Sequence, residues 1–125
     1  MLNKYKNFRE LPVWKLAHEM VLEIYKLTAK FPKKEDYGLT SQIRRFASSV
    51  PANIVEGIYR QSLKELSKFL YNARGSCGET IYHLLLAKDL GYISENEWNI
   101  TSDKYEEIAK QLNGWLKSFK LRINN

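Results

Sequence analysis

The chain has 125 residues, of which 44% are hydrophobic, so it is long enough for one hydrophobic core and too short for two ordinary domains. Its 20 Lys and Arg outnumber its 14 Asp and Glu and leave a formal net charge of +6, which favours contact with a polyanion such as RNA or else serves solubility. No apolar run is long enough to span a membrane and the N-terminus lacks the apolar region of a secretory signal, so we expect a cytoplasmic protein without membrane contact.

The first predicted helix covers residues 12–30. Pro12 suits a first helical turn, and an apolar stripe follows at helical spacing: Val13, Leu16, Ala17, Met20, Ile24 and Leu27. The apolar face of this helix is wider than packing against one neighbouring helix needs, because it also includes Trp14, Val21 and Tyr25. The wider face indicates either contact with another subunit or a helix that is well buried within a single bundle.

A second helix is predicted over residues 36–59, after Phe31 and Pro32 end the first. Pro51 lies inside it and removes one backbone donor, so we expect a kink there or two abutting helices. Polar side chains recur on one face at steps of three or four residues: Arg45, Ser49, Asn53, Glu56 and Arg60. They indicate either an ion pair within the helix or a polar network that fixes the register between helices or subunits.

The third and fourth predicted helices, over residues 63–90 and 95–120, each begin at a capping box. The strings SLKE at 62–65 and SENE at 94–97 have the required Ser-x-x-Glu form, and Gly91 is placed to end the third helix in the left-handed conformation. Gly75 and Gly78, inside the third helix, cost about 1 kcal/mol each relative to alanine. They predict a closely crossing helix or, alternatively, a contact between bare backbone and a ligand phosphate.

Four helices with three short connections predict one all-α domain over residues 1–125, an antiparallel four-helix bundle in up-down-up-down order. Cys77, the lone cysteine, lies on an apolar helix face, where we expect a structural role.

The residues predict no catalytic site, no metal site and no cofactor. Glu79 and His83 lie four apart on one helix face, which allows a weak site for one metal ion or, alternatively, an ordinary surface hydrogen bond. No arginine precedes either histidine by four to six residues, as helical ribonucleases require, and neither a Glu-x-x-Glu pair nor a phosphate-binding glycine loop is present. We therefore expect a protein that is not an enzyme.

Basic residues of the second and third helices form the candidate nucleic-acid site, and Arg60, Lys64 and Lys68 among them span the junction of the two helices. Its six members are Arg44, Arg45, Arg60, Lys64, Lys68 and Arg74. Tyr59 and Tyr71 lie nearby in sequence, and such rings stack on unpaired bases in sites for single-stranded nucleic acid. The alternative is that these charges form a solvated face.

Five motifs, in order, resemble those of the bacterial four-helix bundle proteins that intervening sequences in large-subunit ribosomal RNA genes encode. They are LPVW at 11–14, FP at 31–32 followed by YGL at 37–39, QIRR at 42–45, SVPANIVEG at 49–57 and GSCGE at 75–79, and the likeness covers about residues 8–120. The resemblance implies a homopentamer around a central channel, with a positive surface that engages nucleic acid. Relatives of the family include the accessory variability determinant of diversity-generating retroelements, which looks like a basic adaptor for a reverse transcriptase and its RNA.

The leading hypothesis is therefore a non-enzymatic, oligomeric RNA-binding or RNA-associated protein. A scaffold that recruits another protein, such as a reverse transcriptase, is the alternative. A nuclease or metal enzyme that uses Glu79 and His83 is the third hypothesis.

Overall fold

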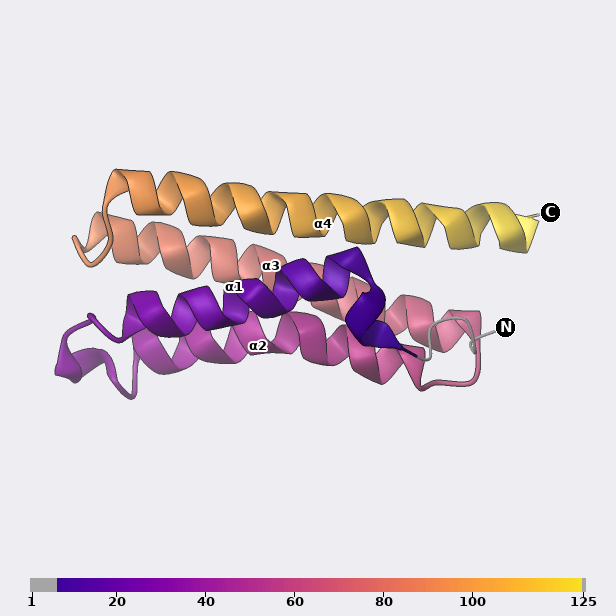
Figure 1. Ribbon diagram of the computed structural model, residues 1–125, viewed down its shortest axis with the longest axis horizontal. Helices are drawn as coiled ribbons and strands as arrows, with labels where there is room; N and C mark the ends of the chain where they lie inside the picture. The colour runs from indigo at the N-terminus through magenta and orange to yellow at the C-terminus, as the bar shows by residue number, and fades with distance from the viewer. Residues whose placement is uncertain (1–6, 125) are drawn as a thin grey trace.

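The structure, a computed structural model, describes residues 7–124 and the side chains of residues 7–120 (Figure 1). Four helices make up most of it: α1 (Pro12–Thr28), α2 (Leu39–Ile58), α3 (Leu63–Asp89) and α4 (Glu95–Asn124). Two short 3₁₀ helices, η2 (Phe8–Glu10) and η3 (Lys33–Glu35), precede α1 and α2, and residues 7–124 contain no strand. The chain is all-α, as the apolar periodicity predicts. Within the described part, no helix has both the length and the apolar character that a membrane span needs.

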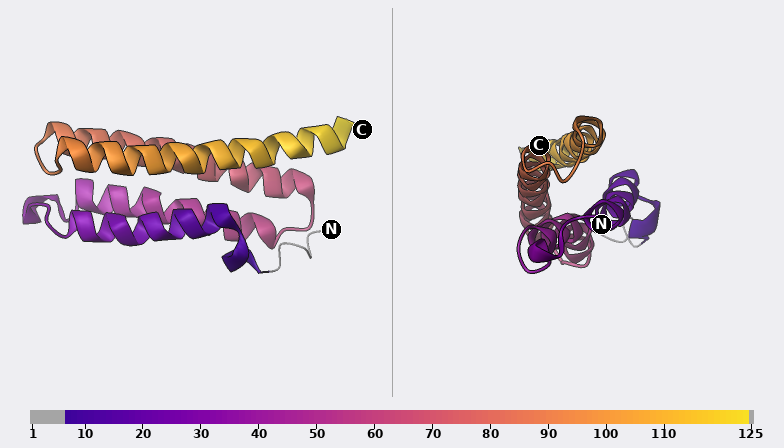
Figure 2. Two further views of the ribbon diagram at one scale, coloured as in Figure 1. Left: turned by 45° about the horizontal axis from the view of Figure 1, so that its top comes forward. Right: turned by 90° about the vertical axis from the view of Figure 1, so that its left-hand side faces the viewer.

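Consecutive helices lie side by side and run in alternate directions (Figure 1). Seen end-on, the four helices surround a common interior (Figure 2). The contact of α2 with α3 is the most extensive, and that of α1 with α4 is the least extensive of the four neighbouring pairs. Buried apolar side chains from all four helices form one core, in which Tyr105 and Phe119 of α4 are the largest fully buried residues. Burial of this core is the main stabilising contribution to the fold.

The connection between α1 and α2 is longer than predicted, because α2 begins at Leu39 rather than near residue 36. Residues 33–35 form the η3 turn instead, and one carboxylate oxygen of Glu35 accepts a hydrogen bond from the N–H of Leu39 (3.2 Å). The other oxygen accepts one from the Tyr92 hydroxyl (2.8 Å), in the connection between α3 and α4. The hydrogen bond from Tyr92, and after it that from Leu39, lowers the pKa of Glu35. One carboxylate thus joins the two connections at this end of the bundle.

The helix α2 continues unbroken through Pro51, so the alternative of two abutting helices is wrong. Proline lacks the N–H that would bond to the carbonyl of Ala47, one turn earlier. Both residues are buried, and the fully buried Ile43 and Ile54 lie on either side of the proline on the same core face. Packing of that face against the core holds the helix together across the missing hydrogen bond.

Gly75 and Gly78 do not mark a close helix crossing, and that expectation is wrong. A Cβ at either position would meet no described atom within 4 Å, so both glycines face open space. The close approach occurs instead at Gly57, where a Cβ would lie 2.9 Å from Cδ1 of Leu66 and 3.0 Å from Cβ of Phe69. Gly57 therefore allows the first turns of α3 to pack tightly against the end of α2.

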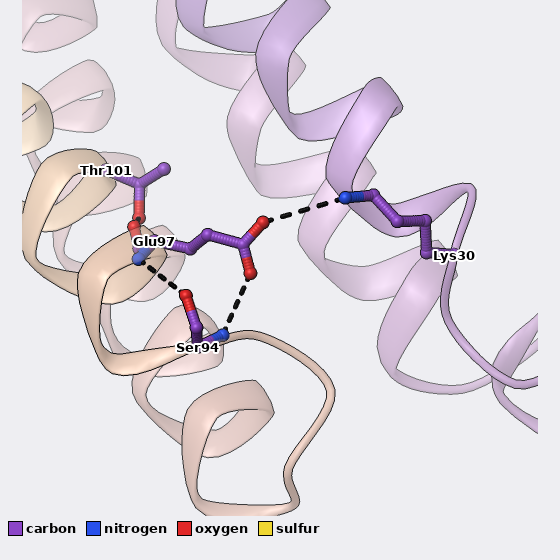
Figure 3. Close-up of polar contacts among 4 residues, drawn as sticks. All are labelled: Lys30, Ser94, Glu97 and Thr101. Atoms are coloured by element: carbon purple, nitrogen blue, oxygen red, sulfur yellow. Dashed lines mark hydrogen bonds and ion pairs between the residues drawn. The ribbon is translucent and has the colours of Figure 1, made fainter.

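The capping box at the start of α4 is complete and also reaches α1 (Figure 3). The N–H of Glu97 donates to Oγ of Ser94 (3.0 Å), and the N–H of Ser94 donates to Oε1 of Glu97 (2.9 Å). Oε2 of Glu97 lies 3.7 Å from Nζ of Lys30, just beyond the end of α1. At the start of α3, Oγ of Ser62 accepts a hydrogen bond from the N–H of Glu65 (3.1 Å). Both helices begin at the serines that the sequence singles out.

The end of α3 is closed by Gly91, which has φ of 82° and so adopts the left-handed conformation that its position predicts. The N–H of Tyr92 donates to the carbonyl of Ala87 and that of Gly91 to the carbonyl of Lys88, both at 2.9 Å. These two hydrogen bonds satisfy carbonyl groups that a helix end otherwise leaves without partners.

The polar face of α2 divides into two parts. Asn53 Nδ2 donates to the carbonyl and hydroxyl oxygens of Ser49 (both 2.8 Å), and Oγ of Ser49 lies 2.9 Å from Oγ of Ser76 on α3. This network links two helices and fixes how they sit against each other. Glu56, in the last turn of α2, instead forms an exposed ion pair with Arg60, two residues beyond the end of that helix (2.6 Å), and exposed pairs of this kind contribute roughly 0–1 kcal/mol.

Candidate nucleic-acid interface

Five basic residues lie on one side of the molecule, over the first turns of α3 and the last turns of α4. They are Lys64, Lys68 and Arg74 of α3, and Lys117 and Lys120 of α4, and all five are exposed. Steps of three or four residues keep side chains on one face of a helix. Because α3 and α4 run in opposite directions, the start of one lies beside the end of the other (Figure 1). We call these five residues, together with Tyr71, the α3–α4 basic face.

Two adjacent hollows shape the α3–α4 basic face. The Arg74 hollow, of about 290 Å³, is lined by Tyr71, Arg74, Asn113, Leu116, Lys117 and Lys120. The Phe119 hollow, of about 600 Å³, is lined by Lys64, Ser67, Lys68, Tyr71, Asn72, Leu116, Phe119 and Lys120. Within residues 7–120, neither lining includes an Asp or Glu and none of the five cations forms an ion pair. Their positive charge is therefore open to an anionic ligand.

Arg74 holds Tyr71 between the two hollows. Its Nη1 donates to Oδ1 of Asn113 on α4 (2.7 Å), and its Cζ lies 4.9 Å from the ring centroid of Tyr71. A cation–π contact of this kind contributes about 0.5–1 kcal/mol at an exposed site. Tyr71 is 41% exposed and borders both hollows, whereas Arg74 lines only the smaller one. The α3–α4 basic face thus combines a fixed aromatic ring with surrounding lysines, which is how proteins bind unpaired nucleic acid.

Half of the predicted site residues belong to this face: Lys64, Lys68 and Arg74. Arg60 lines neither hollow, because it pairs with Glu56 and its Cζ lies 4.8 Å from the ring centroid of Phe69. Tyr59, the second tyrosine considered for stacking, is exposed at the end of α2 and also lines neither hollow. The candidate site therefore lies between α3 and α4 rather than at the junction of α2 and α3.

Arg44 and Arg45 lie in the first half of α2, away from that junction. Nε of Arg44 donates to Oγ1 of Thr28 (2.8 Å), and its Cζ lies 4.5 Å from the ring centroid of Tyr25, so this side chain fastens α2 to α1. Arg45 is exposed and lines, with Arg44, a separate hollow of about 410 Å³. The helix α2 rises about 21 Å from Arg44 to its end at Ile58, and Arg60 lies beyond that end. The six predicted residues consequently do not form one continuous patch.

Lys117 and Lys120 belong to the α3–α4 basic face, yet sequence reasoning did not single them out. Both are far in sequence from the α3 lysines. Each directly follows a residue that the sequence predicts to be in the core, Leu116 or Phe119, and both of those residues are buried. The antiparallel order of neighbouring helices is the signal that could have found them, because it brings the last turns of α4 to the first turns of α3.

The residues considered for catalysis are placed differently. Within residues 7–120, no group of three or more His, Cys, Asp or Glu side chains is arranged to hold a metal ion. His83 stacks on Phe46, with ring centroids 5.4 Å apart, and Glu79 is exposed. Burial raises the pKa of the Cys77 thiol to about 12, so this side chain is a buried thiol at neutral pH and not a thiolate nucleophile.

Comparisons with known proteins agree with this architecture. The family model for 23S rRNA-intervening sequence proteins matches residues 9–114. A crystal structure of a protein of unknown function from the S23 ribosomal protein family of Bacteroides thetaiotaomicron is similar, with a TM-score of 0.76 and 27% identity over 84% of this chain and 98% of that one. No curated protein matches. Lys117 and Lys120 lie just beyond the residues that the family model matches.

Proposed function

This chain belongs to the 23S rRNA-intervening sequence protein family, and from this premise we propose that it is a non-enzymatic protein that binds RNA through the α3–α4 basic face. The observation that carries the proposal is the set of five cations around two hollows whose described lining residues include no Asp or Glu. RNA is a polyanion, and each Lys or Arg that neutralises a phosphate releases a counterion, which drives binding. The formal net charge of +6 supports the same class of partner.

A salt titration tests this proposal. Five phosphate contacts to a single strand predict a slope of about −3.5 for the logarithm of the association constant against the logarithm of the salt concentration. Affinity then falls by roughly 130-fold between about 50 and 200 mM salt. Fluorescence anisotropy with a labelled single-stranded RNA measures both quantities. Failure to bind at low salt, or an affinity that salt does not change, would contradict the proposal.

The proposed form is a cytoplasmic homo-oligomer of antiparallel, up-down-up-down bundles, and the family resemblance implies that it is a pentamer. Support comes from apolar side chains that one chain leaves uncovered. Leu22 and Tyr25 on α1 are 53% and 47% exposed, and Ile100 on α4 is 53% exposed. A groove of about 280 Å³ runs between these two helices, along the least extensive helix contact in the bundle. Apolar surface of this kind is typical of regions that another subunit covers.

A second candidate function is a scaffold that recruits another protein, such as a reverse transcriptase, with the charge serving solubility. The groove between α1 and α4 favours it, because three carboxylates and only one ammonium line that groove beside apolar side chains: Glu19, Glu23, Glu97 and Lys104. Charge reversal at Lys64 and Lys68 separates the two functions. Loss of RNA binding with the oligomer intact supports RNA binding, whereas capture of a protein partner that the reversal leaves unchanged supports the scaffold.

A further inference from the structure

We propose that the Phe119 hollow binds one unpaired nucleobase of a single-stranded RNA, stacked on Tyr71. This inference rests on the RNA binding proposed above and specifies what the RNA must present. It predicts a preference for single strands over duplexes, which positive charge alone does not explain.

The lining of the Phe119 hollow suits a base better than a phosphate. Leu116 and Phe119 lie beneath its α4 side but are only 5% and 1% exposed, so the apolar surface that a base could contact comes mainly from the Tyr71 ring and the methylene stems of the exposed lysines. Its volume of about 600 Å³ lies within the range of roughly 300–1,000 Å³ that small-molecule sites span. A phosphodiester gains nothing from apolar contact, but the flat face of a base does. In a duplex that face is already stacked, so only an unpaired base can enter.

A cation–π contact with Arg74 restrains the Tyr71 ring before any base binds. The guanidinium of Arg74 lies over its ring and is itself anchored to Asn113 on α4. Arg74 lines the smaller hollow only, so the part of the ring that borders the Phe119 hollow is not covered by the guanidinium. A ring that is already ordered costs less conformational entropy when a base stacks on it.

Polar groups around the hollow fit the rest of a nucleotide. Ser67 and Asn72 line it with a hydroxyl and an amide, which can donate to and accept from the edge of a base. Lys64, Lys68 and Lys120 also line it, and their ammonium groups suit the phosphates on either side of that base. The described residues of the lining include no Asp or Glu, so it favours an anionic strand over a cationic partner.

The experiment compares Tyr71→Ala, Tyr71→Phe and wild type by fluorescence anisotropy, with a labelled uridine homopolymer as the single strand and a duplex RNA of equal length. Loss of one base–aromatic stack should weaken single-strand binding by roughly 5- to 100-fold in Tyr71→Ala. Tyr71→Phe, which keeps the ring, should bind within about twofold of wild type. Tyr82→Ala is the matched control, because Tyr82 is also exposed on α3 and lines neither hollow. Far-UV circular dichroism and thermal unfolding verify that each variant is folded.

Two further readouts distinguish stacking from charge. Tyr71→Ala should leave duplex affinity and the salt slope unchanged, since it removes no phosphate contact, and should leave the binding of polyglutamate unchanged as well. Equal losses for single strand and duplex would overturn the base-binding inference and assign Tyr71 a role in placing Arg74. If wild type binds both RNAs equally and Tyr71→Ala has no effect, the inference fails while RNA binding by the basic face stands. If wild type binds neither RNA, the proposed function itself fails.

Discussion

Replacement of Gly57 by alanine tests the tight packing of α3 on α2. In an open helix interior this change stabilises by about 1 kcal/mol, because alanine has the higher helix propensity. At Gly57 the new methyl would lie 2.9 Å from Cδ1 of Leu66, 3.0 Å from Cβ of Phe69 and 3.3 Å from the carbonyl oxygen of Leu66. The Leu66 side chain is fully buried, and the other two atoms move only with the backbone of α3. Such overpacking costs roughly 1–3 kcal/mol, so we expect Gly57→Ala to lower the free energy of unfolding by about 0–2 kcal/mol.

Urea unfolding followed by circular dichroism measures this effect, with Gly78→Ala as the matched control. A Cβ at Gly78 meets no described atom within 4 Å, so the control keeps the gain in helix propensity without the clash. The free energies of unfolding of the two variants should differ by roughly 1–3 kcal/mol, with Gly57→Ala the less stable. Equal stabilisation of both variants would refute the close approach at Gly57.

Three further predictions concern pH, reactivity and assembly. The hydrogen bond from the Ser94 backbone, followed by smaller contributions from the Ser94 side chain and Lys30, lowers the pKa of Glu97. The ionised Glu97 side chain therefore stabilises the fold above the ordinary carboxylate pKa. This stabilisation is lost as the pH falls through the lowered pKa of Glu97. Glu97→Ala should thus destabilise the protein to urea more at about pH 7 than in acid that protonates the carboxylate, and an equal effect under both conditions would count against this. The buried Cys77, with its pKa of about 12, should not react with a thiol reagent at about pH 8 until the chain unfolds, whereas rapid labelling of the native protein would contradict its burial. Light scattering at micromolar concentration should give five times the chain mass of 14.7 kDa, and a mass of one chain would contradict the proposed pentamer.

The helices were predictable from the sequence because their apolar residues recur at steps of three and four, and because Ser94 and Gly91 carry local signals for a start and an end. The roles of the glycines were not. Gly75 interrupts an apolar helix much as Gly57 does, but only Gly57 has a neighbouring helix against it. Which glycine receives a close contact depends on how the helices cross, and local sequence does not contain that information.

The candidate site was predictable to a similar degree. The positions of Lys64 and Lys68 on one helix face follow from their spacing, and Tyr71 follows on the same face. Lys120 joins these residues only because α4 packs against α3, so the sequence did not identify it as part of the candidate site. Arg44 was included because the sequence does not reveal which side chains a basic residue contacts. In the structure its guanidinium donates a hydrogen bond to Thr28 and lies over the ring of Tyr25.

RNA affinity after charge reversal on the α3–α4 basic face tests the central claim most directly. Lys68→Glu/Lys120→Glu reverses two lysines that line the Phe119 hollow, and Lys33→Glu/Lys34→Glu makes the same change in net charge at exposed positions of η3. With labelled single-stranded RNA in fluorescence anisotropy, the first variant should bind at least about tenfold more weakly, with a salt slope near −2, while the second keeps a slope near −3.5. Equal loss in both variants would mean that only overall charge attracts RNA, and would contradict a binding site on this face.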